Sequence, residues 1–229
     1  MLEFSNIKVY DLKESIISCR NAMRLEEPDY NSEDEFEKGL NRAKKLVSAS
    51  ATDQNVKCHD NFMTGIRVSF DMKYTQYITK QFQRYHWFDY VSSSSLMHRI
   101  TKMDFSKCCN KYVSQNSIDE VNKWIGVYNK ILETHPDRYT FDTGKETFNA
   151  LNYKDAIYYA FMMVISNCPM GTELFVRVST NYKQLQTIYH QRKHHKLRED
   201  YKAFMDMVEK LPYAKELILG DTTEEKKIG

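Results

Sequence analysis

Two polar segments of the sequence contain residue types that bind phosphates and nucleotides. The first begins with Gln81 and Arg84, which lie three residues apart in a stretch of helical periodicity from about residue 72 to residue 88. Residues at this spacing share one face of a helix, so a single ligand would meet an amide and a guanidinium. Four serines follow at 92–95, and their hydroxyl and backbone N–H groups would complete a phosphate cradle.

The second segment, residues 180–198, is basic and belongs mostly to a predicted helix that opens at Asn181 and runs to about Glu209. Its cationic residues are Lys183, Arg192, Lys193, Lys196 and Arg198. Thr187 follows Lys183 by four residues, so their side chains can meet on one face. The expected buried stripe is Leu185, Ile188 and Tyr189. A basic helix without matching acids commonly faces an anion, which makes this segment a second candidate site.

Each feature also has a purely structural interpretation. A glutamine and an arginine on one helix face are often only a surface feature, four serines often form only a loop, and basic helices are usually solvated. His190 and His194 lie one helical turn apart, but no carboxylate at a familiar spacing completes a metal site, so we expect no metal. Cys108 and Cys109 could form a disulfide only in a strained geometry, and we expect inert thiols.

The hydrophobic pattern predicts the strands that position these segments. Residues 66–70 alternate apolar and polar side chains, as a half-buried strand does, and residues 172–180 alternate in the same way. Residues 6–10 are a third candidate strand. The stretch 48–57 is polar and turn-like, and the serine-rich stretch 91–100 suits a loop or a helix cap.

Capping-box pairs, in which a serine precedes a glutamate by three residues, predict where two helices start. The pairs are Ser32 with Glu35 and Ser117 with Glu120. The second helix should end at His135–Pro136, because the residue before a proline is pushed out of the helical region. Another helix is expected from about residue 146 to residue 166.

The composition is that of a globular protein. Hydrophobic residues make up 41% of the 229 residues and glycines number only 7, so we expect one domain over residues 1–229, with a polar tail from about residue 220. The net charge of +2 does not indicate nucleic acid binding by the whole molecule. We find no membrane-spanning run or signal peptide and expect a cytoplasmic protein. Five cysteines without a CxxC spacing argue against a disulfide framework.

Taken together, the polar segments resemble the flavin-dependent thymidylate synthases. That family has a glutamine, two residues, and then an Arg-His-Arg triplet. The corresponding positions here are Gln81, Arg84, Tyr85 and His86, of which only the glutamine and the first arginine are kept. A stretch that ends Ser-x-Arg-Tyr follows in the family, and Ser94 falls on its serine. The resemblance covers about residues 55–100 and 155–200.

The downstream half of the resemblance is closer. The family has a proline that leads to Asn-x-Arg-x-Leu and then to a pair of residues that ends in arginine. Here Pro169 leads without a gap to residues 181–185 (NYKQL) and on to Gln191–Arg192. Upstream, His59 and Phe62 reproduce the order of a histidine followed by a phenylalanine.

Three positions depart from the family pattern, and all three would contact the nucleotide. Ile165 and Ser92 stand where the family has an arginine and a glutamate. Leu96 occupies the place of a second arginine, unless a short insertion brings Arg99 there. Each charge-assisted contact is typically worth about 1.5–3 kcal/mol, so losing three would abolish ordinary affinity unless other residues compensate.

The resemblance implies an α+β fold in which helices pack around a small, mostly antiparallel sheet. It implies an enzyme that uses FAD to transfer a methyl group to the pyrimidine C5 of deoxyuridylate (dUMP). Methylenetetrahydrofolate would give the one-carbon unit and NADPH would reduce the flavin. The expected assembly is a homotetramer with sites between subunits.

By the same resemblance, each candidate residue takes a role. The substrate-binding residues would be Gln81, Ser94, Arg99 and Arg192. The flavin-binding residues would be Arg84, His86, Asn181, Lys183 and Thr187. Arg192 would also act in catalysis by polarising the pyrimidine ring.

Two other functions stay open. A divergent enzyme on the same scaffold could modify another pyrimidine nucleotide, for example by hydroxymethyl transfer, and the changes at Ile165, Ser92 and Leu96 favour it. A non-catalytic protein that binds nucleotides or nucleic acid is the other alternative. The basic residues of the segment 183–198 and the many aromatic residues of the chain support it, because together they can stack bases. Residues 101–150 contain no motif that gives them a role.

Overall fold

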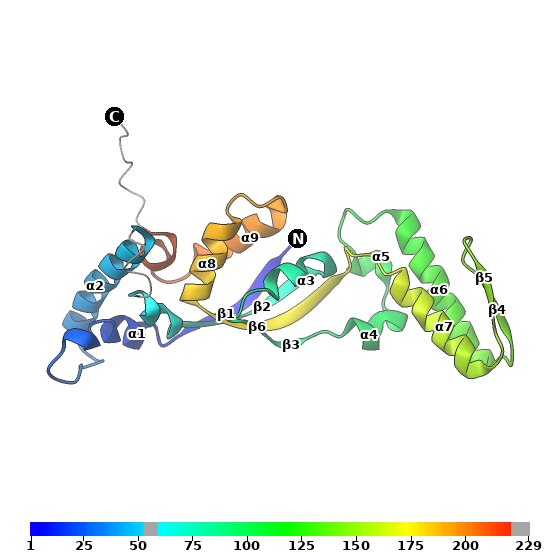
Figure 1. The fold of residues 1–229 in the computed structure, drawn as a ribbon, viewed down its shortest axis with the longest axis horizontal. Helices are drawn as coiled ribbons and strands as arrows, with labels where there is room; N and C mark the ends of the chain where they lie inside the picture. Colours follow the sequence, from blue (N-terminus) through cyan, green and yellow to red (C-terminus); the bar gives the residue numbers. More distant parts are fainter. Residues whose placement is uncertain (53–58, 221–229) are drawn as a thin grey trace, which may run out of the picture. The chain divides into compact units, whose positions relative to one another are not determined.

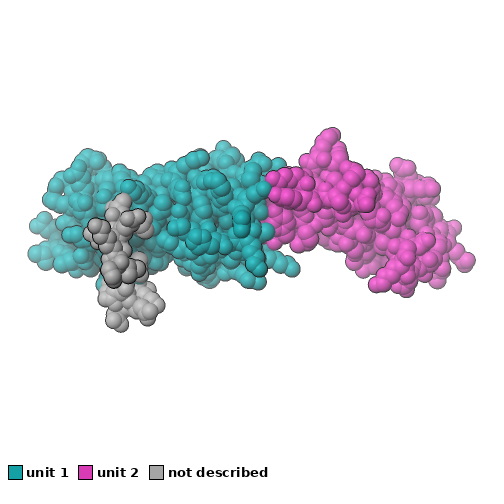
Figure 2. All heavy atoms as spheres, turned by 90° about the horizontal axis from the view of Figure 1, so that it is seen from above, with its two compact units in different colours: residues 1–73, 80–92, 176–229 teal, residues 74–79, 93–175 magenta. Residues whose placement is uncertain are grey.

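The computed structural model describes residues 1–52 and 59–220. The chain forms two compact units, which Figure 2 colours separately. Unit 1 consists of Met1–Lys73, Lys80–Ser92 and Val176–Gly229, and unit 2 of Tyr74–Thr79 and Ser93–Phe175. Residues 221–229 of the predicted tail and residues 53–57 of the predicted turn lie outside the described residues. In the described part of the chain, no helix is long and apolar enough to cross a membrane.

The main sheet has four strands in the order β1-β2-β6-β3. They are β1 (Glu3–Tyr10), β2 (Arg67–Thr75), β6 (Glu173–Asn181) and β3 (Phe88–Ser93). β1 and β2 pair antiparallel. Along β2, Val68, Phe70 and Met72 are fully buried while the residues between them are partly exposed, which confirms the period-two prediction. The stretches predicted to be extended at 6–10 and 172–180 are also strands.

Aromatic side chains hold a helix of unit 1 against this sheet. The helix is α9 (Arg198–Val208), which lies over the sheet in Figure 1. The ring of its Phe204 lies 6.2 Å from the ring of Phe4 in β1 and 5.7 Å from that of Phe82. Phe82 in turn stacks on Phe88 of β3, with 4.8 Å between ring centroids. Such rings bury large apolar areas, and they form the core beneath the candidate site.

The prediction of one continuous C-terminal helix is wrong, because the helix is interrupted in its middle. The chain forms α8 (Tyr182–Arg192), turns at residues 193–197, and continues as α9. In the turn, the imidazole Nδ1 of His195 accepts a hydrogen bond from the N–H of Leu197 (3.1 Å). The break lets the apolar face of α9, with Phe204, Met207 and Val208, return to the core.

The helix predicted at 72–88 is also wrong for most of its length. β2 continues further than expected, and α3 (Gln76–Phe82) has only seven residues. Side chains meet on a helix at spacings of three and four, but Phe82 and Phe88 are six apart and stack on each other. Their contact therefore requires the chain to leave the helix and reverse over residues 83–87.

Near the N-terminus, α1 (Leu12–Ser18) packs against α2 (Glu33–Thr52), and the two lie side by side in Figure 1. The predicted start of α2 is confirmed, because the Ser32 hydroxyl accepts a hydrogen bond from the N–H of Glu35 (3.2 Å). The predicted turn is wrong for residues 48–52, which continue the helix. Serine and alanine in this stretch are compatible with helix when a turn signal such as glycine or proline is lacking.

Unit 2 is built on two long helices and a hairpin, which lie together in Figure 1. These elements are α6 (Gln115–Thr134), α7 (Tyr153–Ser166), β4 (Tyr139–Asp142) and β5 (Thr147–Ala150). Two short helices precede them, α4 (Leu96–Arg99) and α5 (Phe105–Cys108). The rings of Trp124 and Phe141 stack at 6.4 Å in the core of the unit. The sequence predicted the two helices but not the hairpin between them.

Local signals in unit 2 were predicted with mixed success. The N-cap of α6 is Ser114 rather than Ser117, since the Ser114 hydroxyl accepts from the N–H of Ser117 (3.3 Å). Glu120 does not close a capping box, because it accepts a hydrogen bond from the indole of Trp124 (2.6 Å). The predicted end of the helix at His135 is confirmed, and that residue is left-handed, with φ 45°.

The helix predicted from residue 146 begins only at Tyr153. Residues 147–150 pair instead with residues 139–142 in the antiparallel hairpin, which uses their alternating apolar side chains. The side-chain oxygen of Asn152 then caps α7 by accepting from the N–H of Asp155 (2.9 Å).

Candidate functional site

The start of α8 is fixed by Asn181, as the sequence predicted. The Asn181 side-chain oxygen accepts a hydrogen bond from the N–H of Gln184 (2.8 Å), and Asn181 itself is buried. Asparagine is among the preferred N-cap residues because this bond satisfies a helix N–H that has no intrahelical partner. The cap places Asn181 at the junction of β6 and the basic helix.

The segment that follows α3 runs along α8. The N–H of Trp87 donates to the Gln184 side chain (3.2 Å), and the hydroxyl of Thr180 donates to the Trp87 carbonyl (2.6 Å). Trp87 is therefore held by its backbone at the start of α8, while 57% of the residue is exposed. A held backbone and an exposed indole leave the ring available for stacking.

At the other end of α8, Arg192 joins the two polar segments. Its Nε donates a hydrogen bond to the hydroxyl of Tyr85 (2.7 Å), which in turn donates to Gln191 (3.2 Å). The guanidinium lies over two aromatic rings, at 5.6 Å from that of Tyr85 and 5.7 Å from that of Tyr201. These contacts orient the guanidinium and leave its terminal nitrogens without a bond within the described residues.

A pocket of about 450 Å³ opens at the start of α8. Its lining residues are Asn61, Thr64, Arg67, Trp87, Asp89, Ser179, Thr180 and Asn181. Amides, hydroxyls, a guanidinium and the carboxylate of Asp89 thus surround one exposed indole. Binding sites for small molecules commonly combine an aromatic surface with a few polar groups in this way.

Two of the predicted flavin residues are already engaged within the protein. The ammonium of Lys183 pairs with the carboxylate of Asp60, whose side chain is 1% exposed. It also donates to Gln186 (3.2 Å). The hydroxyl of Thr187 donates to the backbone carbonyl of Lys183 (3.0 Å). The positive charge of Lys183 is therefore neutralised, and roles for both residues in flavin binding stay predictions.

The predicted shared face of Gln81 and Arg84 is wrong, because α3 ends between them. Arg84 is exposed on the reversing segment 83–87. His86 is exposed as well, and its ring meets the Trp87 ring edge-on at 4.9 Å. The structure thus brings His86 beside the pocket through Trp87, and the binding roles of Gln81 and Arg84 stay predictions.

Two predicted substrate residues, Ser94 and Arg99, belong to unit 2. The Ser94 hydroxyl accepts from the N–H of Phe175 (3.1 Å), and the Arg99 guanidinium lies 5.4 Å from the centre of the Phe175 ring. The serine stretch is not a simple loop, because β3 extends to Ser93 and Ser95 caps α4. The roles of Ser94 and Arg99 in substrate binding stay predictions.

The substitutions in the family pattern have a structural explanation in unit 2. Ile165 and Leu96 stand where the family has arginines, and both pack against the hydrophobic core of the unit. Both side chains are partly buried, and an arginine at either position would lose part of this apolar packing. Ser92 is exposed at the end of β3.

Sequence reasoning missed Asp60 and Trp87. Trp87 follows the recognised motif directly, and its chemistry as a stacking residue was a usable signal. Asp60 had no such signal, because its pairing with Lys183 joins residues 123 positions apart.

Metal and thiol chemistry have little structural basis in the described residues. No group of three or more histidine, cysteine or acidic residues there is arranged to hold a metal ion. His190 uses its Nε2 to donate to the carbonyl of Ile218 (3.0 Å). Burial raises the pKa of the Cys108 thiol to about 11, so that it stays protonated at neutral pH. Cys108, Cys109 and Cys168 form no disulfide.

Comparison with known proteins shows the fold. No protein-family model and no curated protein matches the sequence. Among solved structures, the chain is similar to the flavin-dependent thymidylate synthase ThyX from Helicobacter pylori complexed with FAD and dUMP. That similarity has a TM-score of 0.54 at 12% identity and covers 96% of this chain and 98% of the other. A second structure of the same enzyme with FAD and dUMP gives 0.52 at 10% identity, with the same coverage. Over nearly its whole length, the chain therefore has an α+β fold similar to that of flavin-dependent thymidylate synthase.

Proposed function

We propose that the chain is a flavin-dependent enzyme that modifies a pyrimidine deoxynucleotide, with methyl transfer to C5 of dUMP as its reaction. The observation that carries the proposal is the meeting of two distant segments in unit 1. Tyr85 of the first motif is hydrogen-bonded to Arg192 of the second, and Trp87, just after the first motif, is hydrogen-bonded to Gln184 of the second. The fold similarity to an enzyme complexed with FAD and dUMP supports it.

The pocket at the start of α8 has side chains that fit a flavin. Trp87 offers an exposed ring for stacking on a flat aromatic ligand, and the hydroxyl and amide groups around it can bond to the polar edge of such a ligand. Asn181 would hold the flavin with its amide N–H groups, because its oxygen is already used by the helix cap. Arg84 and His86 would reach the same ligand from the exposed segment beside Trp87.

Arg192 is the residue that we assign to the nucleotide. Its hydrogen bond to Tyr85 and its two ring contacts orient the guanidinium before any ligand arrives. A fixed cation beside a pyrimidine carbonyl stabilises negative charge that develops on the ring during C5 chemistry. A bound flavin would supply hydride transfer, while the protein supplies position and charge.

Other parts of the proposal come from the resemblance alone. Gln81, Ser94 and Arg99 would complete the nucleotide site, and Lys183 and Thr187 the flavin site. Methylenetetrahydrofolate and NADPH would be co-substrates. Assembly of the chain into a homotetramer with sites between subunits would bring these residues together.

Flavin binding is tested first. Purified protein is titrated with FAD while the near-ultraviolet and visible absorption bands and the flavin fluorescence are recorded. We expect binding at one FAD per chain. Asn181→Asp keeps a capping oxygen but removes the amide donor, so we expect FAD affinity to fall about tenfold. Asn129→Asp, at an exposed position of α6, is the control. Absence of binding at stoichiometric FAD would overturn the flavoenzyme proposal.

The reaction is tested by release of tritium from C5-labelled dUMP with FAD, NADPH and methylenetetrahydrofolate. Loss of the C5 hydrogen is required for any substitution at that carbon. We expect turnover with dUMP, which Arg192→Gln abolishes without loss of FAD binding. Turnover with another pyrimidine nucleotide but not with dUMP would favour the divergent enzyme instead.

A further inference from the structure

A second pocket of unit 1 lies at the opposite end of α8. It has a volume of about 590 Å³ and is formed by the end of α8, the turn and α9. Its lining residues are Arg192, Lys193, His194, His195, Arg198, Tyr201, Lys202, Met205, Asp206 and Glu209. Apart from Arg192, none of them has a role in the function proposed above.

The charges of this pocket do not balance. Four cationic side chains line it against two carboxylates. Of the carboxylates, Asp206 pairs with Lys202 (3.1 Å) and Glu209 accepts a hydrogen bond from the hydroxyl of Tyr189 (2.7 Å). Arg192, Lys193 and Arg198 have no carboxylate within ion-pairing distance among the residues that the structure describes. The pocket therefore has a local excess of positive charge that the net charge of the chain conceals.

A buried donor accompanies these cations. Tyr201 is only 2% exposed, and its hydroxyl has no hydrogen-bond partner in the described part of the chain. Burial raises the pKa of Tyr201 to about 12, so its hydroxyl keeps its proton at neutral pH. A buried hydroxyl without a partner costs free energy, and such groups often mark places where a ligand or water completes the bonding.

His195 provides a second neutral donor. Its Nδ1 accepts from the N–H of Leu197, which leaves the proton of the neutral ring on Nε2. Burial, and then the positive charges of Arg192 and Lys196, lower the pKa of His195. The ring is therefore neutral at physiological pH, and the direction of this shift agrees with the local positive charge.

We propose that this pocket binds the phosphate group of a nucleotide-sized anion. The chemistry fits, because Arg and Lys form charge-assisted bonds to phosphate oxygens and His and Tyr add neutral donors. An ordinary solvated basic surface would have neither a concave shape of this volume nor a buried hydroxyl without a partner. The phosphate belongs to a free nucleotide or to a strand of nucleic acid, and the test separates these sources.

The experiment is calorimetric titration of the whole chain, without flavin, with inorganic pyrophosphate at low salt. The test variant is Arg198→Gln, which removes an exposed cation of the pocket. The matched control is Lys196→Gln, which removes a cation from the same turn that does not line the pocket. We expect Arg198→Gln to weaken binding about tenfold and Lys196→Gln to weaken it less than about threefold.

Tyr201→Phe keeps the ring under Arg192 and removes only the hydroxyl. We expect pyrophosphate binding to weaken about threefold while circular dichroism and thermal unfolding stay close to wild type. Thymidine diphosphate and a short single-stranded thymidine oligonucleotide are then compared as competitors. Displacement by both at similar concentrations indicates a nucleotide site, and far stronger displacement by the oligonucleotide indicates a strand.

Two results would overturn the proposal. One is the absence of pyrophosphate binding at millimolar concentration in low salt. The other is an equal loss of binding in Arg198→Gln and Lys196→Gln, since this would mean a diffuse positive field rather than a site. FAD titration of the same samples keeps this outcome separate from the flavin proposal, because none of the three variants alters the pocket at the start of α8.

Discussion

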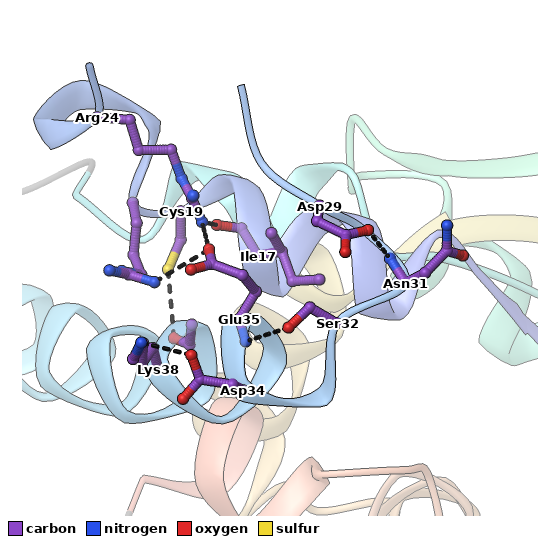
Figure 3. Close-up of polar contacts among 11 residues, drawn as sticks. Ile17, Cys19, Arg24, Asp29, Asn31, Ser32, Asp34, Glu35 and Lys38 are labelled. Carbon is purple, nitrogen blue, oxygen red and sulfur yellow. Dashed lines mark hydrogen bonds and ion pairs between the residues drawn. The ribbon is translucent and has the colours of Figure 1, made fainter. Parts of the chain in front are cut away.

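Two clusters of cationic residues in unit 1 differ in what surrounds them. Between α1 and α2, Arg24 and Arg20 both donate to the carboxylate of Glu35, as Figure 3 shows for Arg24 and Glu35. At the turn between α8 and α9, Arg192 and Arg198 meet no carboxylate among the described residues. In the first cluster, which we call the paired cluster, both guanidinium groups share a carboxylate, whereas the second cluster keeps its charge available to a ligand.

The paired cluster of Arg20, Arg24 and Glu35 holds two helices together. Arg24 also donates to the carbonyl of Ile17 (3.4 Å), so it ties the end of α1 to α2. The helices approach closely at Gly39, where an added Cβ would lie 2.7 Å from the carbonyl oxygen of Ile16. Hydrogen bonding from Arg24, with smaller contributions from the charges of Arg24 and Arg20, lowers the pKa of Glu35. These contacts have a structural role, because they engage both guanidinium groups with a carboxylate of the fold.

The same contrast occurs between the two ends of α8. Lys183 near its start pairs with buried Asp60, whereas Lys193 just beyond its end has no carboxylate partner among the described residues. A cation paired with a buried carboxylate contributes to stability, because its removal leaves an uncompensated charge in the interior. A solvated cation can be removed at little cost to the fold. The following predictions test this difference, from the largest expected effect to the smallest.

Lys183→Met should destabilise the protein by about 3 kcal/mol, because Asp60 loses its partner while it stays buried. Lys193→Met should change stability by less than about 0.5 kcal/mol. Urea unfolding followed by circular dichroism measures both. Adding Asp60→Asn to Lys183→Met should recover part of the loss. Equal losses of stability in the two lysine variants would contradict the difference between a paired and a solvated cation.

Asn181→Ala should destabilise the protein by about 1 kcal/mol, because the first turn of α8 loses its cap. Asn181→Asp should retain this stability, since its carboxylate can cap the helix. Thermal unfolding of the two variants gives the comparison. If the aspartate variant unfolds as easily as the alanine variant, the cap does not explain the role of this residue.

Tyr85→Phe should cost about 0.5 kcal/mol of stability, because Arg192 Nε loses its acceptor while the ring contact remains. The same variant should lower turnover with dUMP more than it lowers FAD affinity, since the guanidinium is less well oriented. Steady-state kinetics and FAD titration measure the two effects. Tyr158→Phe, at an exposed position of α7, is the control.

Glu35→Gln should reduce the fall in the free energy of unfolding between neutral and acidic pH. The pKa of Glu35 is lowered in the folded protein, so its charge stabilises the fold above the ordinary glutamate pKa, and this contribution is lost as the pH falls through the folded-state value. Urea unfolding at neutral and acidic pH measures the change. Glu37→Gln, an exposed position on the same helix, should leave the profile unchanged.

Local signals predicted much of the fold where they act over a few residues. The alternation along β2 and the caps at Ser32 and Asn181 depend on neighbours in sequence, and all three were predicted. The resemblance to flavin-dependent thymidylate synthases, drawn from two short stretches, agrees with the fold similarity over nearly the whole chain. In unit 2 the two long helices were predicted, although their starts were misplaced, and the β4–β5 hairpin between them was not.

The sequence by itself determined the strands β1, β2 and β6, the helix starts at Ser32 and Asn181 and the presence of a basic segment, because each follows from side-chain period or capping over a few residues. Only the tertiary structure decided where the helices break and which cations are neutralised. The chain reverses between Phe82 and Phe88 because the two rings pack in a shared core. Lys183 pairs with Asp60, which lies 123 positions away in the sequence. Such pairings depend on packing between distant segments. The charge that remains for a ligand at Arg192 and Arg198 was therefore decided by the fold and not by the local pattern.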